Sequence, residues 1–398
     1  MRAITKDLFY VGADNIGLNL FENIYPLTNG VSYNSYLLID DKTVLFDTVD
    51  ETVRETFLSQ VQQTLNGRSL DYLVIHHMEP DHCALIKTVV ELHPEITLIC
   101  NAKTQSLLNQ FFEFDPCPHY LIVKEGDTFA TAHHTFHFVM APMVHWPEVM
   151  MSFDEKTGIL FAADAFGTFN ALTGNLYADE VPFESDWLEE ARRYYANIVG
   201  KYGMQVQNIL KKASQLPIRM ICPLHGPIWR KNIPWFIEKY QRWSCYMPEE
   251  QAVVIMVATI YGHTLSAAQQ LADLLGERGI KNIRLYDLSA THPSRIVSEV
   301  FRASHLVFAG VTYNMGLFPP METLLDDLIA HNVQGRTVAL MENGSWAPVA
   351  GKLMKEKISC LKNIHLIEPV LTIKSAFKKS QQPDLEKMAD CIARDIGG

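Results

Sequence analysis

Histidine and carboxylate side chains gather in one short segment of this sequence, which reads H-x-E-x-D-H. The segment supplies His77, Glu79, Asp81 and His82. In extended backbone, alternate residues point to the same side, so His77, Glu79 and Asp81 can reach one cleft together. Pro80 stiffens the turn between two of them and lowers the entropy cost of holding them. Imidazole and carboxylate groups in this pattern indicate a metal site.

Three further side chains of the same kind each follow a short apolar run that is typical of a strand. They are His145, Asp164 and His225. Taken alone, His145 or His225 is more simply a surface or hydrogen-bonded core histidine. Strand ends in layered α/β structures share one rim, however, so we expect all seven side chains in a single pocket.

The number of carboxylates bears on the kind of metal. Glu79, Asp81 and Asp164 with one bridging hydroxide would supply about four negative charges, which matches two divalent ions. Hard, anionic ligands favour iron or manganese over zinc. We expect Asp164 to bridge the two ions.

The N-terminal part mixes short strands with intervening helices. Short apolar runs around polar turns predict two hairpins, and a sheet-and-helix sandwich follows from the mixture. The expected hairpins lie at residues 36–47 and 150–162, further strands at 71–75, 96–100 and 136–140, and helices at 52–65 and 187–199.

The C-terminal part alternates strictly between strands and helices, which predicts a small doubly wound parallel sheet. The break between the two patterns falls in residues 243–250, so we expect one domain at 1–248 and a second at 249–398. The expected strands lie near residues 253–258, 283–288, 306–310, 338–341 and 365–369.

Three loops at strand ends of the second domain are suited to hold a nucleotide. In the first, hydroxyls of Thr259 and Thr264 with N–H groups around Gly262 can cradle a phosphate at a helix N-terminus. An ordinary turn capped by Thr264 would look the same if it stood alone. The loops at 312–320 and 342–348 fall where such a sheet places its ligand crevice.

The composition limits the remaining possibilities. The chain has 398 residues, 48% of them hydrophobic, and a formal charge of −11, which argues against nucleic acid as a partner. No apolar run approaches the roughly 20 residues of a membrane span. The seven cysteines form no C-x-x-C pair, which excludes rubredoxin-type iron centres within this chain. With no secretory signal at the N-terminus, we expect a cytoplasmic protein.

The metal segment resembles the H-x-H-x-D-H pattern of the metallo-β-lactamase superfamily, with Glu79 in place of the second histidine. That replacement, with a flavodoxin-like domain after it, resembles the flavodiiron protein family (A-type flavoproteins) in its two-domain form without a rubredoxin extension. The resemblance covers essentially the whole chain. It implies an α/β protein in which a metallo-β-lactamase-like αβ/βα sandwich precedes a flavodoxin-like doubly wound parallel sheet.

The resemblance also implies roles for particular residues. His77, Glu79 and His145 would hold one iron, while Asp81, His82 and His225 hold the other and Asp164 bridges. Tyr195 would supply a proton or a hydrogen bond near the irons. FMN, preferred to FAD because no second phosphate loop is visible, would contact Thr259, Ile260, Tyr261, Gly262, His263, Thr264, Thr312, Tyr313, Asn314, Asn343, Gly344, Ser345 and Trp346.

The implied activity is reduction of O2 to water, of NO to N2O, or of both, with electrons delivered through FMN. A rubredoxin or similar protein would be the electron donor. A head-to-tail homodimer, or a dimer of dimers, would bring the FMN of one subunit to the irons of the other. Two alternative functions are those of a dinuclear zinc hydrolase with an appended flavodoxin-like domain and of a non-enzymatic electron carrier.

Overall fold

The computed structural model describes residues 2–397, which form two compact units. The first unit comprises the chain up to Tyr195 together with Met204–Gln241, and the second comprises Ala196–Gly203 together with the chain from Arg242 onward. The expected boundary after residue 248 lies a few residues beyond Gln241. Nothing in the sequence marks Ala196–Gly203 as part of the second unit.

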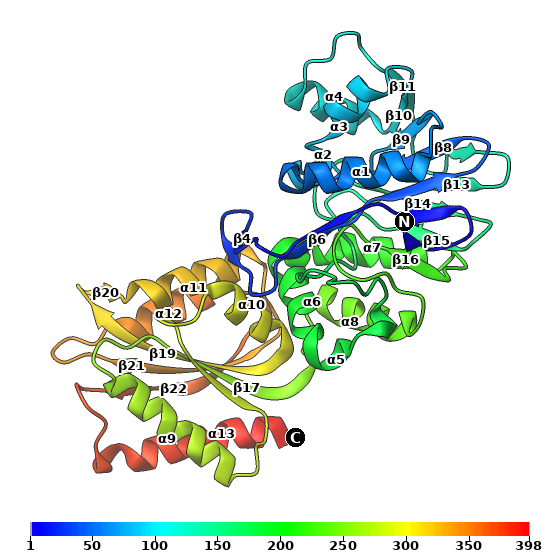
Figure 1. The fold of residues 1–398 in the computed structure, drawn as a ribbon. Helices are drawn as coiled ribbons and strands as arrows, with labels where there is room; N and C mark the ends of the chain where they lie inside the picture. The colour runs from blue at the N-terminus through cyan, green and yellow to red at the C-terminus, as the bar shows by residue number, and fades with distance from the viewer. Residues whose placement is uncertain (1, 398) are drawn as a thin grey trace. The chain divides into compact units, whose positions relative to one another are not determined.

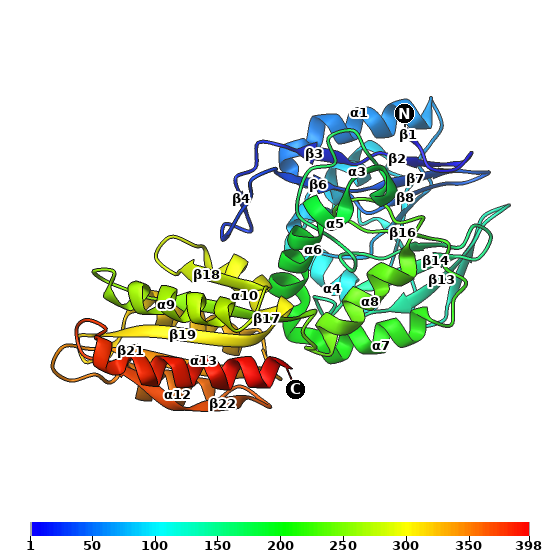
Figure 2. The same cartoon turned by 90° about the horizontal axis from the view of Figure 1, so that it is seen from below.

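The first unit contains two large sheets. The seven-stranded sheet has the order β1-β2-β7-β8-β9-β10-β11, and the five-stranded sheet has the order β12-β13-β14-β15-β16. Figure 1 and Figure 2 show α1 (Arg54–Leu65) outside one sheet and α7 (Gly203–Ala213) and α8 (Ile233–Ser244) outside the other. The unit is therefore a helix–sheet–sheet–helix sandwich, as predicted.

Every strand predicted for the first unit is present, whereas β1 to β6, β11 and β12 were not predicted. The predicted hairpins are β7 with β8, joined at the polar turn after Ile39, and β14 with β15. The strands are β1 Arg2–Ala3, β2 Leu8–Tyr10, β7 Tyr36–Ile39, β8 Thr43–Phe46, β9 Tyr72–Val74, β10 Thr97–Cys100, β11 His119–Ile122, β12 Thr128–Ala130, β13 Thr135–Met140, β14 Met150–Asp154, β15 Ile159–Phe161 and β16 Met220–Cys222, with β3 Ala13–Asn15 paired to β6 Val31–Tyr33 and β4 Leu20–Phe21 paired to β5 Tyr25–Pro26.

The remaining helices of this unit are mostly short. The helix expected at 187–199 is in fact α6, Leu188–Tyr194, which continues as a π-helical turn at Tyr195–Val199. Such turns are often found at functional sites. The other helices are α2 Pro80–Cys83, α3 Ile86–Leu92, α4 Ala102–Phe111 and α5 Phe183–Asp186.

The second unit is built on a parallel sheet of order β18-β17-β19-β21-β22, in which every neighbouring pair on that path is parallel. This is the flavodoxin-like strand order. From β17 the chain first adds β18 on one side and then β19, β21 and β22 on the other, so the order of the strands reverses between β17 and β19. The strands are β17 Glu250–Val257, β18 Ile283–Asp287, β19 Ala303–Tyr313, β21 Thr337–Asn343 and β22 His365–Ile373, with the short β20 Gly316–Leu317 paired to the end of β19.

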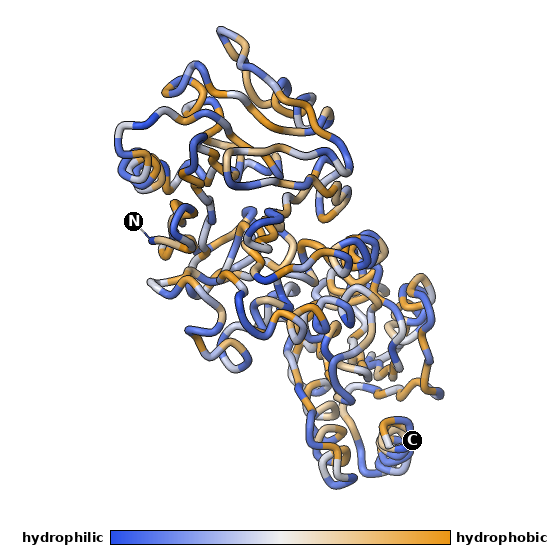
Figure 3. The backbone as a smooth tube through the Cα atoms, turned by 90° about the vertical axis from the view of Figure 1, so that its right-hand side faces the viewer, coloured by the Kyte–Doolittle hydropathy of each residue, from blue (hydrophilic) through white to orange (hydrophobic). Residues whose placement is uncertain are grey.

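Helices cover both faces of this sheet, which explains why β17 is a nearly continuous apolar run. In Figure 1 the pair α9 (His263–Glu277) and α13 (Gln382–Gly397) lies on one face, and α10 (Pro293–Arg302), α11 (Pro319–Ala330) and α12 (Ala350–Ile358) lie on the other. In Figure 3 the C-terminal helix, seen nearly end-on beside the label C, carries both hydrophobic and hydrophilic residues, as expected for an amphipathic helix that packs one side on a core. That core includes Leu271, Val307 and Leu385, all buried.

Among residues 2–397, no helix combines the length and the hydropathy that a bilayer crossing requires.

Candidate metal centre and cofactor pocket

The seven predicted metal ligands converge in the first unit, and each follows the end of a strand. The loop after β9 holds His77 and Glu79 and leads directly into α2. The other ligands are Asp81 and His82 on α2, His145 between β13 and β14, Asp164 after β15, and His225 after β16. The ligands therefore come from both sheets of the sandwich.

A first group consists of His77, Glu79, His145 and Asp164, whose ligating atoms lie within 4.8 Å of one another. The carboxylate of Glu79 is 3.3 Å from His77 Nε2 and 2.9 Å from His145 Nε2. Asp164 Oδ2 is 3.4 Å from His77 Nε2 and 3.2 Å from His145 Nε2. Two imidazole nitrogens thus face two carboxylate oxygens across one small space.

A second group, Asp81, His82 and His225, lies beside the first. Asp81 Oδ2 is 3.2 Å from His225 Nε2 and 3.4 Å from His82 Nε2. The other oxygen of Asp164, Oδ1, is 3.1 Å from His82 Nε2 and 3.8 Å from His225 Nε2. Asp164 therefore presents one oxygen to each group, which is the geometry expected of a bridging carboxylate.

The chemistry of this donor set fits two cations. Both oxygens of Asp81 are buried and accept no hydrogen bond from any residue in 2–397. His82 Nε2 and His225 Nε2 face each other at 3.0 Å, so at most one of them can carry a proton in that contact. Buried charges are stable only when paired or metal-bound. Three carboxylates and four imidazoles at this density therefore favour two metal ions over a purely hydrogen-bonded cluster.

Hydrogen bonds from behind orient two of the imidazoles. His77 Nδ1 donates to Glu148 Oε1 at 2.9 Å, and the same oxygen accepts the N–H of Met78. His225 Nδ1 donates to the carbonyl of Ser32 at 2.8 Å. Both bonds fix the tautomer that leaves Nε2 free toward the pocket. His82 differs, because its buried Nδ1 has no hydrogen-bond partner in the described part of the chain.

A buried hydrogen-bond chain anchors the loop that carries His77. His76, directly before His77, makes two contacts with the carboxylate of Asp47. Oδ1 of Asp47 accepts the backbone N–H of His76 at 2.7 Å, and Oδ2 lies 2.5 Å from His76 Nδ1. His76 Nε2 lies 2.7 Å from Ser152 Oγ in β14. This chain ties the ends of β8 and β9, in one sheet, to the other sheet.

The backbone is also specialised next to two ligands. Ala163, directly before Asp164, has a φ of 48°, a region that residues with a Cβ seldom adopt. Gly226, directly after His225, has a φ of +75°, and a Cβ there would lie 2.2 Å from Thr168 Cγ2. Only glycine fits at that position, which indicates that the path of the chain past His225 is tightly set.

The close packing of charges shifts the proton affinities of the ligands. Burial acts to lower the pKa of His82 and of His145, but the neighbouring carboxylates outweigh it and raise each pKa to about 9. Burial acts to raise the pKa of Glu79, but hydrogen bonds from His145 and His77 outweigh it and hold that pKa below its usual range. Without metal, the site therefore retains protons on imidazoles beside ionised carboxylates.

The tyrosine predicted to assist the site is not the one that faces it. Tyr195 makes its ring contact with Tyr240, at a centroid distance of 4.9 Å. Its neighbour Tyr194 lies 5.5 Å from the ring of His225, and its buried hydroxyl has no hydrogen-bond partner among residues 2–397. Burial and the charge of Asp164 raise the pKa of Tyr194 well above its usual value. Because consecutive helical residues point in different directions, the pair Tyr194–Tyr195 could not be resolved from sequence.

Sequence reasoning also missed Glu22, in the turn between β4 and β5. The residue as a whole is exposed, yet its carboxyl end is enclosed against Glu79. Burial, followed by the charge of Glu79, raises the pKa of Glu22 to about 8. The neighbouring Phe21 packs edge-on to His225 at 5.4 Å, so this hairpin covers the metal cluster. A lone glutamate in a polar turn carries no signal that could have revealed this.

The second unit contains a pocket of about 580 Å³ at the carboxyl ends of its central strands. All but one of the predicted FMN-binding residues line it, and the exception, Gly262, lies between two of them with a φ of 86° at the start of α9. The residues that sequence reasoning missed are Val311, Met315, Ala347 and Ser375.

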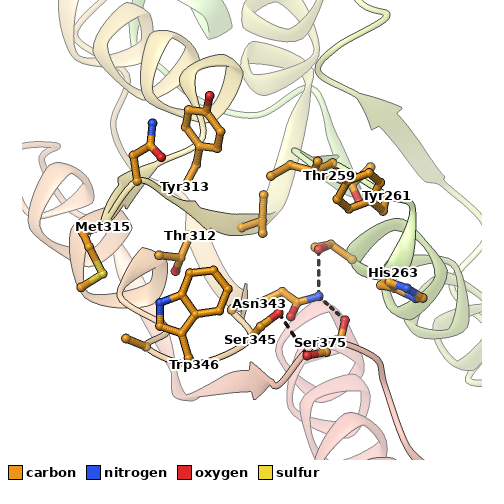
Figure 4. A pocket seen from close by; sticks show the side chains of 16 residues that line it. Thr259, Tyr261, His263, Thr312, Tyr313, Met315, Asn343, Ser345, Trp346 and Ser375 are labelled. Atoms are coloured by element: carbon orange, nitrogen blue, oxygen red, sulfur yellow. Dashed lines mark hydrogen bonds between the residues drawn. The ribbon is translucent and has the colours of Figure 1, made fainter.

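Polar groups gather on one part of the pocket wall. Asn343 Nδ2 donates to Thr264 Oγ1 at 3.2 Å and to the carbonyl of Ser375 at 3.0 Å (Figure 4). Thr259 Oγ1 accepts the N–H of Gly262. These bonds shape the loop at the N-terminus of α9, whose N–H groups suit a phosphate.

Aromatic side chains lie on the opposite wall of the pocket. Figure 4 shows Tyr313 and Trp346 across the pocket from Tyr261 and His263. Trp346 is 88% exposed and Tyr261 is 89% exposed, values that are unusual for such large side chains. Their faces are available to a flat ring system. Thr312 lines the pocket too, but its Oγ1 accepts the N–H groups of Val349 and Ala350 and so caps α12.

Known proteins resemble this chain over most of its length. Residues 31–226 match the family model described as ODP family beta lactamase. The chain is 31% identical to a nitric oxide reductase from Moorella thermoacetica over 375 residues, which covers 93% of this chain and 92% of that protein. It is 28% identical to an anaerobic nitric oxide reductase flavorubredoxin from Vibrio vulnificus, covering 81% of this chain and 65% of that longer protein.

Solved structures share the fold over nearly the whole chain. The rubredoxin oxygen:oxidoreductase of Desulfovibrio gigas superimposes with a TM-score of 0.92 at 26% identity, covering 99% of this chain and 98% of that one. The flavodiiron protein of Giardia intestinalis gives a TM-score of 0.91 at 23% identity, with the same coverage.

A metal-binding β-lactamase-like sandwich joined to a flavodoxin-like unit defines a class of two-domain redox flavoproteins. This chain belongs to the flavodiiron protein family. The predicted fold class and family are thereby confirmed.

Replacing Asp164 by asparagine should abolish loading of a full pair of ions. The substitution keeps the side-chain shape but removes the charge that both groups share. Loss of a residue that only hydrogen-bonds to a ligand weakens metal affinity about 10–100-fold. Loss of a ligand shared by both groups should therefore weaken the affinity by more than about 100-fold. Iron per chain, measured by elemental analysis, should fall to one or fewer. The exposed Glu55→Gln in α1 serves as a control, and undiminished iron in Asp164→Asn would contradict the bridging geometry.

The stability of the metal-free protein should fall as the pH rises from about 6.5 to about 9. Histidines whose pKa is raised on folding stabilise the folded chain fully below their unfolded pKa and lose this effect as pH passes the folded pKa. His82 and His145, with pKa values raised to about 9, set that window. Metal-loaded protein, whose imidazoles are already deprotonated, should not show the loss. Melting temperatures of both forms across this range provide the measurement, and parallel curves would refute the expectation.

Replacing Trp346 by alanine should weaken FMN binding about threefold to tenfold, the value of one aromatic stacking contact. Trp346→Phe should retain most of the affinity. Since Trp346 is 88% exposed, neither change should disturb folding. Affinities follow from titration of FMN fluorescence. Equal affinity in all three proteins would show that Trp346 does not contact the ring.

Proposed function

We propose that this chain is a flavodiiron oxidoreductase that reduces dioxygen to water, nitric oxide to nitrous oxide, or both. The observation that carries the proposal is Asp164, whose two oxygens face two separate groups of histidine and carboxylate ligands. A second unit with a flavin-sized pocket supplies the means to deliver electrons. Relatives named nitric oxide reductase and rubredoxin oxygen:oxidoreductase support both substrates.

The metals would be two irons, one of them held by His77, Glu79 and His145. Asp81, His82 and His225 would hold the other, and Asp164 would offer one oxygen to each group. When bound, two irons supply electrons to a small diatomic ligand and polarise it. The carboxylates favour iron over zinc because they are hard, anionic donors. For O2 the overall change consumes four electrons and four protons to give two waters, and for two NO it consumes two electrons and two protons to give N2O and water.

The surrounding residues hold the site and control its access to water. Glu148 and the carbonyl of Ser32 keep the Nε2 atoms of His77 and His225 directed at the irons. Phe21 and Tyr194 pack against His225 and exclude solvent from that side. The proton-supplying role predicted for Tyr195 is better suited to Tyr194, because the ring of Tyr194 lies 5.5 Å from that of His225 whereas the ring of Tyr195 packs on Tyr240.

The flavin would be FMN: the N-terminus of α9 would hold its phosphate, and the aromatic side chains labelled in Figure 4 would hold its ring. A pocket of about 580 Å³ suits a mononucleotide, and the sequence shows no second phosphate loop for FAD. The remaining lining residues from Thr259 to Trp346 serve as contacts to the ring edge and ribityl chain.

Electrons arrive from a separate protein, because the chain contains no C-x-x-C pair that could hold a rubredoxin-type iron. A rubredoxin or a similar small carrier fits this role, as the names of relatives suggest. We further propose a head-to-tail homodimer, or a dimer of dimers, in which the FMN of one subunit serves the irons of the other. The cytoplasmic location remains a prediction.

The alternative is a dinuclear zinc hydrolase, since the sandwich fold also supports hydrolysis. The carboxylate Glu79 at the second ligand position and the flavin-sized pocket both favour redox chemistry. Metal analysis distinguishes the two, because zinc with ester or lactam hydrolysis would replace the redox proposal.

Anaerobic reduction followed by rapid mixing with each gas tests the proposal. O2, NO, or both should reoxidise the reduced FMN in a fast phase. With O2, the hydrogen peroxide formed should be less than one molecule per O2 consumed. The absorbance of FMN reports the rate, and Asp164→Asn with its flavin intact is the control that should lose the fast phase. Equal rates in the two proteins would show that the flavin reacts directly and would end the proposal.

A further inference from the structure

The metal cluster of the first unit reaches solvent through three of its seven ligands. The side chains of Glu79, His145 and Asp81 are 13%, 11% and 11% exposed, respectively. The side chains of the other four ligands are at most 1% exposed, namely His77, His82, Asp164 and His225. A small molecule that comes from solvent must therefore pass Glu79, His145 or Asp81 to reach the cluster.

Glu22 stands at this opening. Its carboxyl group donates a hydrogen bond to Glu79, and the charges of Glu79, His145 and Asp81 act on it. These are the same three ligands that solvent reaches. The residue as a whole is exposed, although its carboxyl end is enclosed. The side chain of Glu22 therefore extends from solvent to the ligands and occupies the opening.

Aromatic contacts fix the hairpin that carries Glu22. Phe21, directly before it, is buried and lies edge-on to His225 at 5.4 Å and to Phe169 at 5.5 Å. Tyr25, at the start of β5, lies 6.1 Å from the same Phe169 ring. Movement of the turn away from the cluster would bring Phe21 into water, and the burial of a large aromatic ring opposes this.

The backbone of the turn is specialised as well. Glu22 has a φ of 50° and Asn23 a φ of 55°, both in the left-handed region. Glutamate seldom adopts this conformation, and such strain is common at functional sites, where the surrounding contacts hold it in place. The turn therefore sets the direction of the Glu22 side chain. Alanine or glutamine at this position would meet the same backbone restriction, because both have a Cβ.

We propose that the side chain of Glu22 is a gate that selects the ligands of the metal cluster by size. It admits linear molecules of two or three atoms, which include O2 and NO, and it excludes molecules that carry a ring beside the coordinating atom. This inference rests on the proposed function, because it requires metal ions in the cluster. A gate of this kind keeps larger organic molecules away from a reactive centre and so limits side reactions.

Azide and phenol are suitable probes, because both bind ferric iron as monoanions and give a charge-transfer absorbance, but only phenol carries a ring. Titration of the oxidised full chain, loaded with FMN and iron, measures both affinities. Native protein should bind azide and should bind phenol only weakly. Glu22→Ala should bind phenol at least about tenfold more tightly, the lower end of the selectivity that one methylene-sized group gives in a pocket, with azide affinity almost unchanged. Glu22→Gln keeps the bulk of the side chain and should behave as the native protein does.

Asn23→Ala is the matched control, since it truncates an exposed neighbour in the same turn, and it should bind both probes as the native protein does. The gate is overturned if native protein and Glu22→Ala bind phenol equally. It is also overturned if Glu22→Gln binds phenol as tightly as Glu22→Ala, which would assign the exclusion to charge, or if Asn23→Ala does so, which would assign it to movement of the hairpin. Failure of the proposed function looks different: native protein would then hold no iron and give no azide absorbance, and both proposals would fall.

Discussion

The structure of the first unit depends on one electrostatic constraint: three carboxylates and four imidazoles share a pocket from which water is largely excluded. Asp164 is the centre of this constraint, because each of its oxygens faces a different group of ligands. Such a cluster is unfavourable on its own, since few donors are available to its buried oxygens. Two cations would relieve it, because their charge would balance that of the carboxylates.

The same constraint links the two sheets of the sandwich. His77 and Asp81 follow a strand of the seven-stranded sheet, whereas Asp164 and His225 follow strands of the five-stranded sheet. Bonds outside the cluster reinforce the link, as from His76 to Ser152 and from His225 to Ser32. Metal binding and sheet packing therefore stabilise each other.

The sequence predicts which seven side chains converge in this cluster because their type and their place after strand ends are both local properties. The parallel sheet of the second unit was equally predictable from alternating runs such as Val253–Ala258. Supporting residues were not predictable in this way. Glu148, Ser32 and Glu22 reach the site through backbone paths that bring distant segments together, and no periodicity records such contacts. The choice between Tyr194 and Tyr195 could not be made from sequence for a related reason, since it depends on the rotation of a helix that ends in a π-helical turn.

The spacing of the ligands along the chain has a consequence for biosynthesis. His77 is made early, but His225 enters the chain almost 150 residues later, near the end of the first unit. A ribosome-bound nascent chain that ends before His225 contains only part of the second group of ligands. A full pair of metal ions could therefore not bind until nearly the whole first unit has emerged, whereas the pocket of the second unit needs only the segments made afterwards. The order of synthesis thus sets the earliest point at which a pair of metal ions could bind, and that point comes before the second unit is complete.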